Sequence, residues 1–434
     1  HAMTGIRIVG AVADLTTAET AVLLERGTAT DDAIRSRVAE LITRVRRHGD
    51  SALLELAREL DGVALESLEV PREARRHALA MLEPDLARAL ERARNNIRAA
   101  HRAFLPNATE IETEPGVFVG RRLDPLQRVG IYAPGGRAAY PSSVLMGAVP
   151  ARVAAVEEII LCTPPGPDGL PSSVVLAAAE LAGVHRVFAI GGAGAIAAMA
   201  YGTATVPRVD RIVGPGNAYV AEAKLQVSGI VGIDSPAGPS ELLVIADDSS
   251  DPDRVALELL AQAEHDPRAC VVAVAIGAEV HSAVLDALAR AVPRQARHDI
   301  ITLALATNGA VLRSDSLGEA IGFANRYAPE HLLLAVRDPR KVLRAVRNAG
   351  TVFLGECCSV AFGDYITGAN HVLPTGGLAR SYSGLSVLDF MRWTTFQRVD
   401  PAAAERLAQD VAVLAEAEGL PAHAAAARAR EVVR

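Results

Sequence analysis

The stretch RVGIYAPGGRAAYPSS, Arg128–Ser143, decides the fold class. Its apolar start predicts a strand, its Gly- and Pro-rich continuation from Gly135 predicts a loop, and a helix is predicted over Val144–Val153. The same alternation continues with strands over Glu158–Thr163, Arg186–Ile190 and Arg211–Val213, and helices over Ser172–Leu181, Ala195–Tyr201 and Ala218–Val227. Buried, β-branched strands that alternate with helices predict a parallel sheet covered on both faces.

A second alternating unit follows. Strands are predicted over Glu241–Ala246, Cys270–Ala275, Ile300–Ala306, His331–Val336 and Thr351–Leu354, and helices over Pro252–His265, Val280–Ala291, Leu317–Tyr327 and Arg340–Asn348. Ser250 or Asp251 is a candidate N-cap for the Pro252 helix. Two successive units of this kind predict two sheet domains with a cleft between them.

The flanking segments have a different character. Apolar residues at helical spacing predict helices over Ala33–Arg46 and Ser51–Leu60, and alternation over Ile111–Arg121 predicts one or two strands. From Pro401 the chain is Ala-rich and helical, with breaks at Gly419 and Pro421. This tail is too small to fold alone, so we expect it to dock on another surface.

The fold class predicted is therefore α/β, with two incomplete Rossmann-like parallel-sheet domains, a helical N-terminal part and a small helical C-terminal tail domain. The predicted boundaries are residues 1–24 for an N-terminal extension, 25–122 for the helical segment, 123–238 for the first sheet domain, 239–384 for the second and 385–434 for the tail.

Composition narrows the function. The formal net charge is -7 and no block rich in Lys and Arg is present, which argues against nucleic acid as a partner. No apolar run is long enough to span a bilayer, and the N-terminus lacks a signal-peptide pattern; His1-Ala2 before Met3 is typical of a cloning remnant. The cysteines form no CxxC pair, so we expect a protein of a reducing compartment, the cytoplasm, without a cysteine zinc site.

Polar side chains gather in GDYITGANHVLPTGG, Gly363–Gly377, which reads as an irregular loop. It carries Asp364, Tyr365, Asn370 and His371. An Asp and a His together can bind a transition metal or form an acid–base pair. The alternative is a turn whose polar groups satisfy its own backbone.

Two further pairs could share a site with this loop. Gln262 and His265 lie three residues apart near a helix end, so they share a face and could form an N/O metal site with Asp364. The alternative for His265 is a favourable interaction with the helix dipole. Glu330 and His331 are adjacent in YAPEHL and could serve separate proton transfers if the backbone turns at Pro329.

The evidence for a nucleotide is indirect, because neither unit has a GxGxxG after its first strand. GGAG at Gly191–Gly194 and VGPGN at Val213–Asn217 are strand-end turns that could open onto phosphates, or tight turns without a ligand. In the tail, EAEGLPAH places Glu418 and His423 around a polar break in an Ala-rich helix.

Together these motifs resemble the histidinol dehydrogenase family, zinc- and NAD-dependent enzymes. The likeness covers nearly the whole chain from Arg128. It rests, in family order, on RVGIYAPGG, AYPSSVLM, VPRVDRIVGPGNAYV, SPAGPSELLVIAD, AQAEHD, YAPEHL, GDYITGANHVLPTGG, SGLSVLDF and EAEGLPAH.

The resemblance implies roles for particular residues. It assigns Glu330 and His331 to acid–base catalysis and one zinc ion per subunit to Gln262, His265, Asp364 and His423. It implies NAD contacts at Tyr132, Gly194 and Asn217. Substrate contacts are implied for Ser240, Gln262, His265, His331, Asp364, His371, Glu418 and His423. Gly194 departs from the family, where GGAQAI commonly has Gln at this position and this chain has GGAGAI.

The resemblance also implies an assembly and a reaction. The family forms homodimers in which the tail of one subunit completes the site of the other, and its helical N-terminal segment joins the second sheet unit. The reaction oxidises L-histidinol through a held aldehyde to L-histidine and reduces two NAD. Two alternatives stay open: a sister zinc dehydrogenase acting on another polyfunctional alcohol, such as a sulfonated diol, and a non-catalytic nucleotide-binding protein on the same scaffold.

Overall fold

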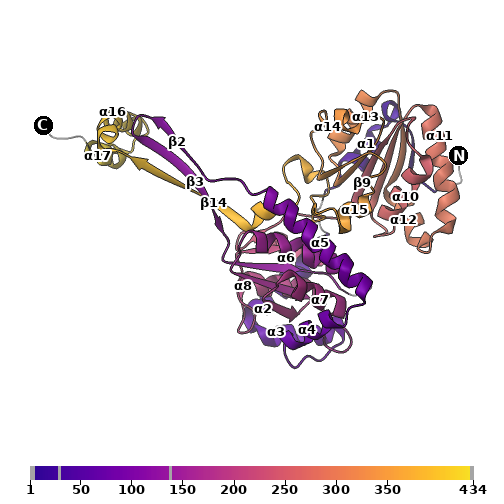
Figure 1. Ribbon diagram of the computed structural model, residues 1–434, viewed down its shortest axis with the longest axis horizontal. Coiled ribbons are helices and arrows are strands. Elements are labelled where there is room, and N and C mark those ends of the chain that lie inside the picture. The colour runs from indigo at the N-terminus through magenta and orange to yellow at the C-terminus, as the bar shows by residue number, and fades with distance from the viewer. Residues whose placement is uncertain (1–4, 28–30, 136–138, 431–434) are drawn as a thin grey trace.

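The computed structural model describes residues 5–27, 31–135 and 139–430. A parallel sheet with the order β6-β5-β4-β7-β8 forms the centre of one half of the body (Figure 1). Its strands are β4 (Arg128–Tyr132), β5 (Glu158–Thr163), β6 (Arg186–Ala189), β7 (Arg211–Val213) and β8 (Gly232–Ile233). We call it the first sheet. The predicted parallel alternation is confirmed here, although part of the predicted loop, residues 136–138, lies outside the described residues.

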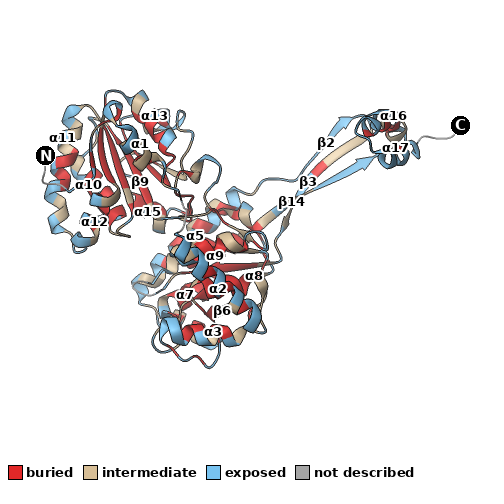
Figure 2. Ribbon diagram, turned by 180° about the vertical axis from the view of Figure 1, so that it is seen from behind, coloured by how far each residue is buried: buried red, intermediate tan, exposed pale blue. Residues whose placement is uncertain are grey.

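Helices cover both faces of the first sheet. Packed on one face are α6 (Pro141–Val153) and α7 (Ser173–Ala182), with α4 (Arg72–Ala80) and α5 (Pro84–Ala103) outside them. Packed on the other face are α8 (Gly192–Tyr201) and α9 (Ala218–Val227), with α2 (Asp32–His48) and α3 (Asp50–Leu56) outside them. The strands and inner helices are almost fully buried (Figure 2), so this half has its own hydrophobic core.

The second sheet is also parallel, with the order β1-β11-β10-β9-β12-β13. Its strands are β1 (Ile8–Ala11), β9 (Glu241–Ala246), β10 (Cys270–Ile276), β11 (Gly309–Ser314), β12 (His331–Ala335) and β13 (Thr351–Leu354). One face packs on α10 (Pro252–Ala263), α11 (Ala278–Ala291), α12 (His298–Asn308) and α15 (Val360–Tyr365). The other packs on α1 (Thr17–Leu24), α13 (Leu317–Tyr327) and α14 (Pro339–Leu343).

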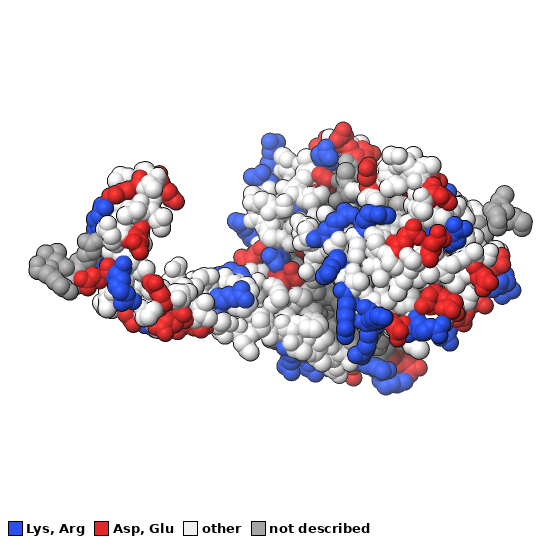
Figure 3. Space-filling model, turned by 90° about the horizontal axis from the view of Figure 1, so that it is seen from above, with Lys and Arg blue, Asp and Glu red and all other residues white. Residues whose placement is uncertain are grey.

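An arm projects from the body (Figures 1 and 3). It consists of an antiparallel sheet of β2 (Thr109–Glu114), β3 (Val117–Pro125) and β14 (Met391–Val399), capped by α16 (Pro401–Ala417) and α17 (Pro421–Arg428). Figure 3 shows acidic and basic side chains on the arm and interspersed over the face of the body in view. The one or two strands predicted over Ile111–Arg121 and the helical break at Gly419 are confirmed, and the strands pair as a hairpin.

The arm leaves apolar side chains uncovered within one chain. Val411, Val413 and Leu414 of α16 are 42%, 52% and 67% exposed, and Leu420, in the break before α17, is 41% exposed. An apolar surface on a projecting element is typical of a contact with another chain.

The predicted strand over Ile300–Ala306 is wrong. These residues lie in α12, and the strand is the next segment, β11. The segment is rich in β-branched and apolar residues, which favoured a strand. Its buried side chains, Ile301, Ala304 and Leu305, instead recur at helical spacing.

The helical segment was expected to pack with the second sheet, and this is also wrong. Buried residues of α2 to α5, such as Leu41, Leu53 and Ile97, belong to the same core as Ile131 of the first sheet. It is the N-terminal extension that joins the second sheet, through parallel pairing of β1 with β11. The free edge of β11 offers unpaired backbone groups, and residues 8–11 supply the short apolar strand that pairs with them. Parts of the extension and the tail, residues 1–4 and 431–434, lie outside the described residues.

No helix in the described residues is long and apolar enough to cross a membrane.

Candidate active site

A left-handed turn brings Glu330 and His331 to one place. The helix α13 ends at Tyr327, and Ala328 follows with a φ of +51°, a conformation that non-glycine residues rarely adopt. Pro329 then leads into β12, whose first residue is His331. Both side chains are buried, and both line the same cavity. The backbone turn that Glu330 and His331 need in order to face one site is therefore present.

The imidazole of His331 lies between two carboxylates. Its Nδ1 is 3.4 Å from Oε2 of Glu330, and its Nε2 is 3.4 Å from Oδ1 of Asp364. Nδ1 also donates to the carbonyl of Glu241 at 2.9 Å. Because a carbonyl oxygen only accepts, the neutral ring carries its proton on Nδ1 and its lone pair on Nε2. Nε2 is buried and has no hydrogen-bond partner among the described residues.

The carboxylates control the charge of His331. Burial opposes the charged imidazole, but Glu330 and Asp364 raise the pKa of His331 well above its ordinary value. Burial likewise opposes the charged form of Asp364, but His331, His371 and His265 hold the pKa of Asp364 below its ordinary value. The site is an electrostatically coupled group, the kind of arrangement that marks functional centres.

The Glu330 carboxylate is fixed by hydrogen bonds. Its Oε2 accepts from the hydroxyl of Ser240 at 2.7 Å and from the backbone N–H of Glu241 at 2.7 Å. Ser240 precedes β9, so the predicted substrate residue Ser240 contacts the predicted catalytic residue directly. These bonds orient one face of the carboxylate.

His371 joins the two halves of the body. Its Nδ1 donates to the carbonyl of Asp364 at 2.9 Å, and its Nε2 accepts from the hydroxyl of Ser143 in α6 at 3.2 Å. Burial lowers the pKa of His371, so a neutral ring suits both bonds. Asn370 fits the alternative of a structural turn, because its amide donates to the carbonyl of Met146 and accepts from the N–H of Val372.

The loop Gly363–Gly377 is not wholly irregular. Its first residues form the end of α15, so Asp364 projects from the last turn of a short helix. The Pro252 helix is shorter than predicted: α10 ends at Ala263, and His265 lies just beyond it. Asp251 caps α10, as predicted, by accepting from the N–H of Asp253.

The predicted zinc ligands are only partly brought together. Gln262 is buried with its Nε2 unpartnered among the described residues, and His265 and Asp364 line one cavity and interact electrostatically. These are nitrogen and oxygen donors of the kind that zinc accepts. No group of three or more His, Cys, Asp or Glu residues arranged to hold a metal is found in the described parts of the chain. The donors present fit zinc in kind, and one chain does not complete the set.

Glu418 and His423 lie elsewhere. Glu418 follows α16 and His423 lies in α17, at the far end of the arm from the body (Figure 1). Both side chains are exposed. A single chain therefore does not bring these two predicted residues to the cavity that contains His331.

Two adjoining cavities occupy this region. The first, about 210 Å³, lies between the two halves and is lined by residues of both, including Ser143, Ser240, His265, His331 and Asp364. The second, about 880 Å³, lies at the carboxyl edge of the first sheet and shares Tyr140, Pro215 and Gly216 with the first. This edge is where open α/β sheets bind ligands.

The predicted cofactor residues line the second cavity. Tyr132 ends β4, its hydroxyl accepts from the N–H of Gly192 at 3.0 Å, and burial raises the pKa of Tyr132 to about 12. Asn217 caps α9 by accepting from the N–H groups of Tyr219 and Val220. A Cβ at Gly194 would meet side-chain carbons of Leu56 and Leu53 at 3.2 and 3.4 Å, so α3 takes the space beside this glycine.

Sequence reasoning missed several residues of the site. The sequence predicts a loop at Ser143, whereas the structure places it in α6, and its position beside a predicted helix after a strand was a usable signal. Lys224 lines the first cavity and donates to the carbonyl of Gly214, and its ammonium pairs with Asp234. Arg26 lies in none of the quoted motifs, Glu241 lies in SPAGPSELLVIAD with no role assigned to it, and their pairing across 215 residues has no sequence signal.

Comparison with known proteins gives a consistent result. The family model described as histidinol dehydrogenase matches residues 24–431. The chain is 47% identical over 420 residues to the histidinol dehydrogenase of Methanosarcina barkeri, covering 96% of both chains. It is 46% identical over 431 residues to that of Nitrosomonas europaea, covering 99% of this chain and 100% of the relative.

A solved structure agrees along the entire length. The crystal structure of histidinol dehydrogenase from Elizabethkingia anophelis superimposes with a TM-score of 0.93 at 34% identity, covering 99% of each chain. Family match, high identity and full-length structural agreement lead to one conclusion: this chain belongs to the histidinol dehydrogenase family of oxidoreductases.

Proposed function

We propose that the protein oxidises L-histidinol through L-histidinaldehyde to L-histidine, with zinc in the site and reduction of two NAD, as the last steps of histidine biosynthesis. The observation that carries the proposal is the position of His331 in the first cavity. Its unpartnered Nε2 lies beside Asp364, and Glu330 lies at its Nδ1. The matched relatives are named for this substrate, which supports the same assignment.

The two oxidations need proton transfers that this pair can supply. In the first oxidation, neutral His331 takes the hydroxyl proton of the alcohol on Nε2, while its Nδ1–H remains bound to the carbonyl of Glu241. In the second, Glu330 activates the water that hydrates the aldehyde. The Glu330 carboxylate is held in place by hydrogen bonds from Ser240 and from the N–H of Glu241. The two adjacent residues thus serve separate steps: His331 in the oxidation of the alcohol, and Glu330 in the hydration of the aldehyde.

NAD is assigned to the second cavity. Its volume suits a ligand larger than the substrate, and it opens onto the first cavity at Tyr140, Pro215 and Gly216. The N-terminus of α9 and its Asn217 cap lie at this junction and favour an anionic group. NAD accepts the hydride, so the chain has to supply position and proton transfer only.

Zinc is assigned to Gln262, His265, Asp364 and His423. Bound there, zinc would hold the amine and imidazole of the substrate. It would also neutralise the Asp364 charge that raises the pKa of His331, and so favour the neutral imidazole. The body of one subunit contributes the first three donors, and His423 is assigned to the partner's tail.

The tail supports a homodimer with shared sites. Glu418 and His423 stand at the end of an arm that projects away from the body, and the exposed apolar residues of α16 favour a partner surface. A second copy whose tail reaches the first cavity would complete the substrate and metal contacts.

Substrate identity is tested by turnover. Zinc-loaded protein is supplied with NAD and either L-histidinol or a sulfonated diol, and NADH absorbance is followed. NADH formation with L-histidinol and none with the diol is expected, because Glu418, Ser240 and His371 suit an imidazole-bearing amino alcohol. The reverse preference would assign the sister activity to this chain.

Site sharing is tested by mixing subunits. His423→Ala and His331→Ala each remove one component of a site, and both homodimers should be inactive. Unfolding and refolding the two together should restore about a quarter of wild-type activity, since half of the dimers are mixed and each has one intact site. Absence of recovery, with mixed dimers formed, would argue for sites built within one chain.

A further inference from the structure

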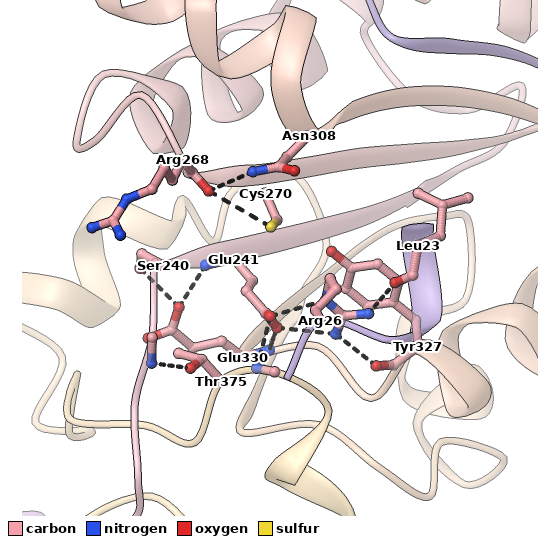
Figure 4. Close-up of polar contacts among 12 residues, drawn as sticks. Leu23, Arg26, Ser240, Glu241, Arg268, Cys270, Asn308, Tyr327, Glu330 and Thr375 are labelled. Atoms are coloured by element: carbon pink, nitrogen blue, oxygen red, sulfur yellow. Dashed lines mark hydrogen bonds and ion pairs between the residues drawn. The ribbon is translucent and has the colours of Figure 1, made fainter. Parts of the chain in front are cut away.

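A buried ion pair lies directly behind the catalytic pair (Figure 4). Nε of Arg26 is 3.0 Å from Oε1 of Glu241, and Nη2 is 3.3 Å from Oε2. The two side chains are only 7% and 2% exposed. Arg26 follows α1 in the N-terminal segment, and Glu241 begins β9. A guanidinium and a carboxylate arranged as two parallel contacts form a geometrically specific pair.

Glu241 contacts both catalytic residues. Its backbone N–H donates to Oε2 of Glu330 at 2.7 Å, and its carbonyl accepts from Nδ1 of His331 at 2.9 Å. Its side chain accepts from the backbone N–H of Glu330 at 3.3 Å and from that of Gly376 at 2.8 Å. One residue therefore links the Glu330 turn, the catalytic imidazole and the loop that contains Asp364.

Arg26 also holds the turn itself. Its Nη2 donates to the carbonyl of Tyr327 at 2.8 Å, and its guanidinium lies 3.3 Å from the centre of the Tyr327 ring. Nη1 donates to the carbonyl of Leu23. Tyr327 ends α13 immediately before left-handed Ala328, so Arg26 contacts the start of the segment that directs Glu330 and His331 into the cavity. It reaches the end of that segment through Glu241.

The charge of Arg26 balances two buried carboxylates. The titratable groups that face Glu241 are Arg26, Glu330, Tyr327 and Cys270, and His331 faces Glu330 at 3.4 Å. Arg26 is the cation that contacts the Glu241 carboxylate itself. Without it, two interacting buried carboxylates would favour sharing a proton, since like charges in a poorly solvated site do not both ionise. A protonated Glu241 would also accept more weakly from the N–H groups of Glu330 and Gly376.

We propose that Arg26 is a positioning residue for this reaction: through Glu241 it holds the turn at Tyr327–His331 and keeps Glu330 available as a carboxylate base. The inference rests on the proposed roles of Glu330 and His331. It adds a residue of the N-terminal segment that lines neither the first nor the second cavity.

The test compares Arg26→Met, Arg26→Lys and the double variant Arg26→Met/Glu241→Gln, with Arg290→Met as the control. Arg290 of α11 forms an exposed ion pair with Asp253 of α10. Arg26→Met should lower kcat about a hundredfold, because breaking one side of a buried pair leaves an uncompensated charge. The KM for substrate should change little, and the acidic limb of the kcat profile should move to higher pH.

The double variant separates charge from packing. Replacing both partners removes the unpaired carboxylate, so kcat should recover about tenfold over Arg26→Met and the pH profile should return toward wild type. Arg26→Lys keeps the charge and loses the two-contact geometry, so it should keep the wild-type pH profile with a smaller loss of kcat. Arg290→Met should behave as wild type.

A second readout needs no substrate. Infrared spectra at pH 7 should show a protonated carboxyl in Arg26→Met that is absent from wild type and from the double variant. That readout stands even if the wild-type protein fails to oxidise histidinol, which would refute the proposed function alone. If Arg26→Met does not fold, Arg26→Gln takes its place in both measurements.

Two results would overturn the proposal. One is an Arg26→Met protein with wild-type kcat and pH profile. The other is a loss of activity that the double variant does not relieve, with no protonated carboxyl in the infrared spectrum, because Arg26 would then contribute packing alone.

Discussion

Lowering the pH should destabilise the protein through His101, at the end of α5. Its ring is 1% exposed, packs edge-on against Phe104, and accepts from the N–H of Val387 on Nδ1 at 3.2 Å. Nε2 has no partner among the described residues. Burial therefore lowers the pKa of His101 from 6.5 to about 4. The interaction with Val387 joins α5 to the segment that enters the arm.

The size of the loss in unfolding free energy follows from the difference between the folded and unfolded pKa of His101. The unfolded chain binds a proton at His101 below about pH 6.5, and the folded protein does so only near pH 4, so stability falls as the pH drops through this window. The difference of 6.5 − 4 = 2.5 in pKa corresponds to about 3 kcal/mol over the whole window, and about 2 kcal/mol between pH 7 and pH 5.

The assay is urea unfolding at pH 7, 6 and 5, followed by the fluorescence of Trp393, the single tryptophan, in β14. His101→Gln keeps an acceptor for Val387 and does not titrate, so the variant should lose about 2 kcal/mol less than wild type between pH 7 and pH 5. His48→Gln, an exposed position on α2, is the control and should follow wild type. Equal pH dependence in wild type and His101→Gln would refute the reasoning.

Three substitutions give further tests. Gly350→Ala places a Cβ 2.5 Å from the backbone oxygen of Glu330, so it should cost about 1–3 kcal/mol in urea unfolding and lower kcat; wild-type kcat would contradict the account of the Glu330 turn. Asn217→Ala should lower the free energy of unfolding by about 1 kcal/mol through loss of the α9 cap and raise the KM for NAD, and an unchanged KM would remove Asn217 from the cofactor site. His265→Asn should lose zinc, measured by metal analysis, together with activity, and retained metal would refute the ligand assignment.

The sequence predicted the sheets well because their signals are local. Within Arg128–Val153 the sequence passes from an apolar strand through glycines to a helix. Repetition of such strand–helix units predicts a parallel sheet. The helix α12 was not predicted because the composition of the segment favours a strand. Only the helical spacing of its buried residues Ile301, Ala304 and Leu305 indicates a helix. Tertiary packing on the second sheet decided between the two.

The site was predictable where several motifs converge on one cavity. Glu330, His331, Asp364 and His371 meet in the structure, and each lies at a strand end or in a short polar segment. The Arg26–Glu241 pair was not predictable, because Arg26 lies in none of the motifs, Glu241 begins an apolar strand, and the two residues are 215 positions apart. The same holds for the packing of α2 to α5, whose amphipathic faces do not specify which sheet they cover.

Counting NADH formed per L-histidinol consumed, with zinc-loaded protein and excess NAD, tests the proposed two-step oxidation most directly. The account predicts about two NADH per histidinol, with L-histidine as product and no turnover after a chelator removes the metal. One NADH per histidinol with aldehyde release, or unchanged turnover in the chelator, would contradict it.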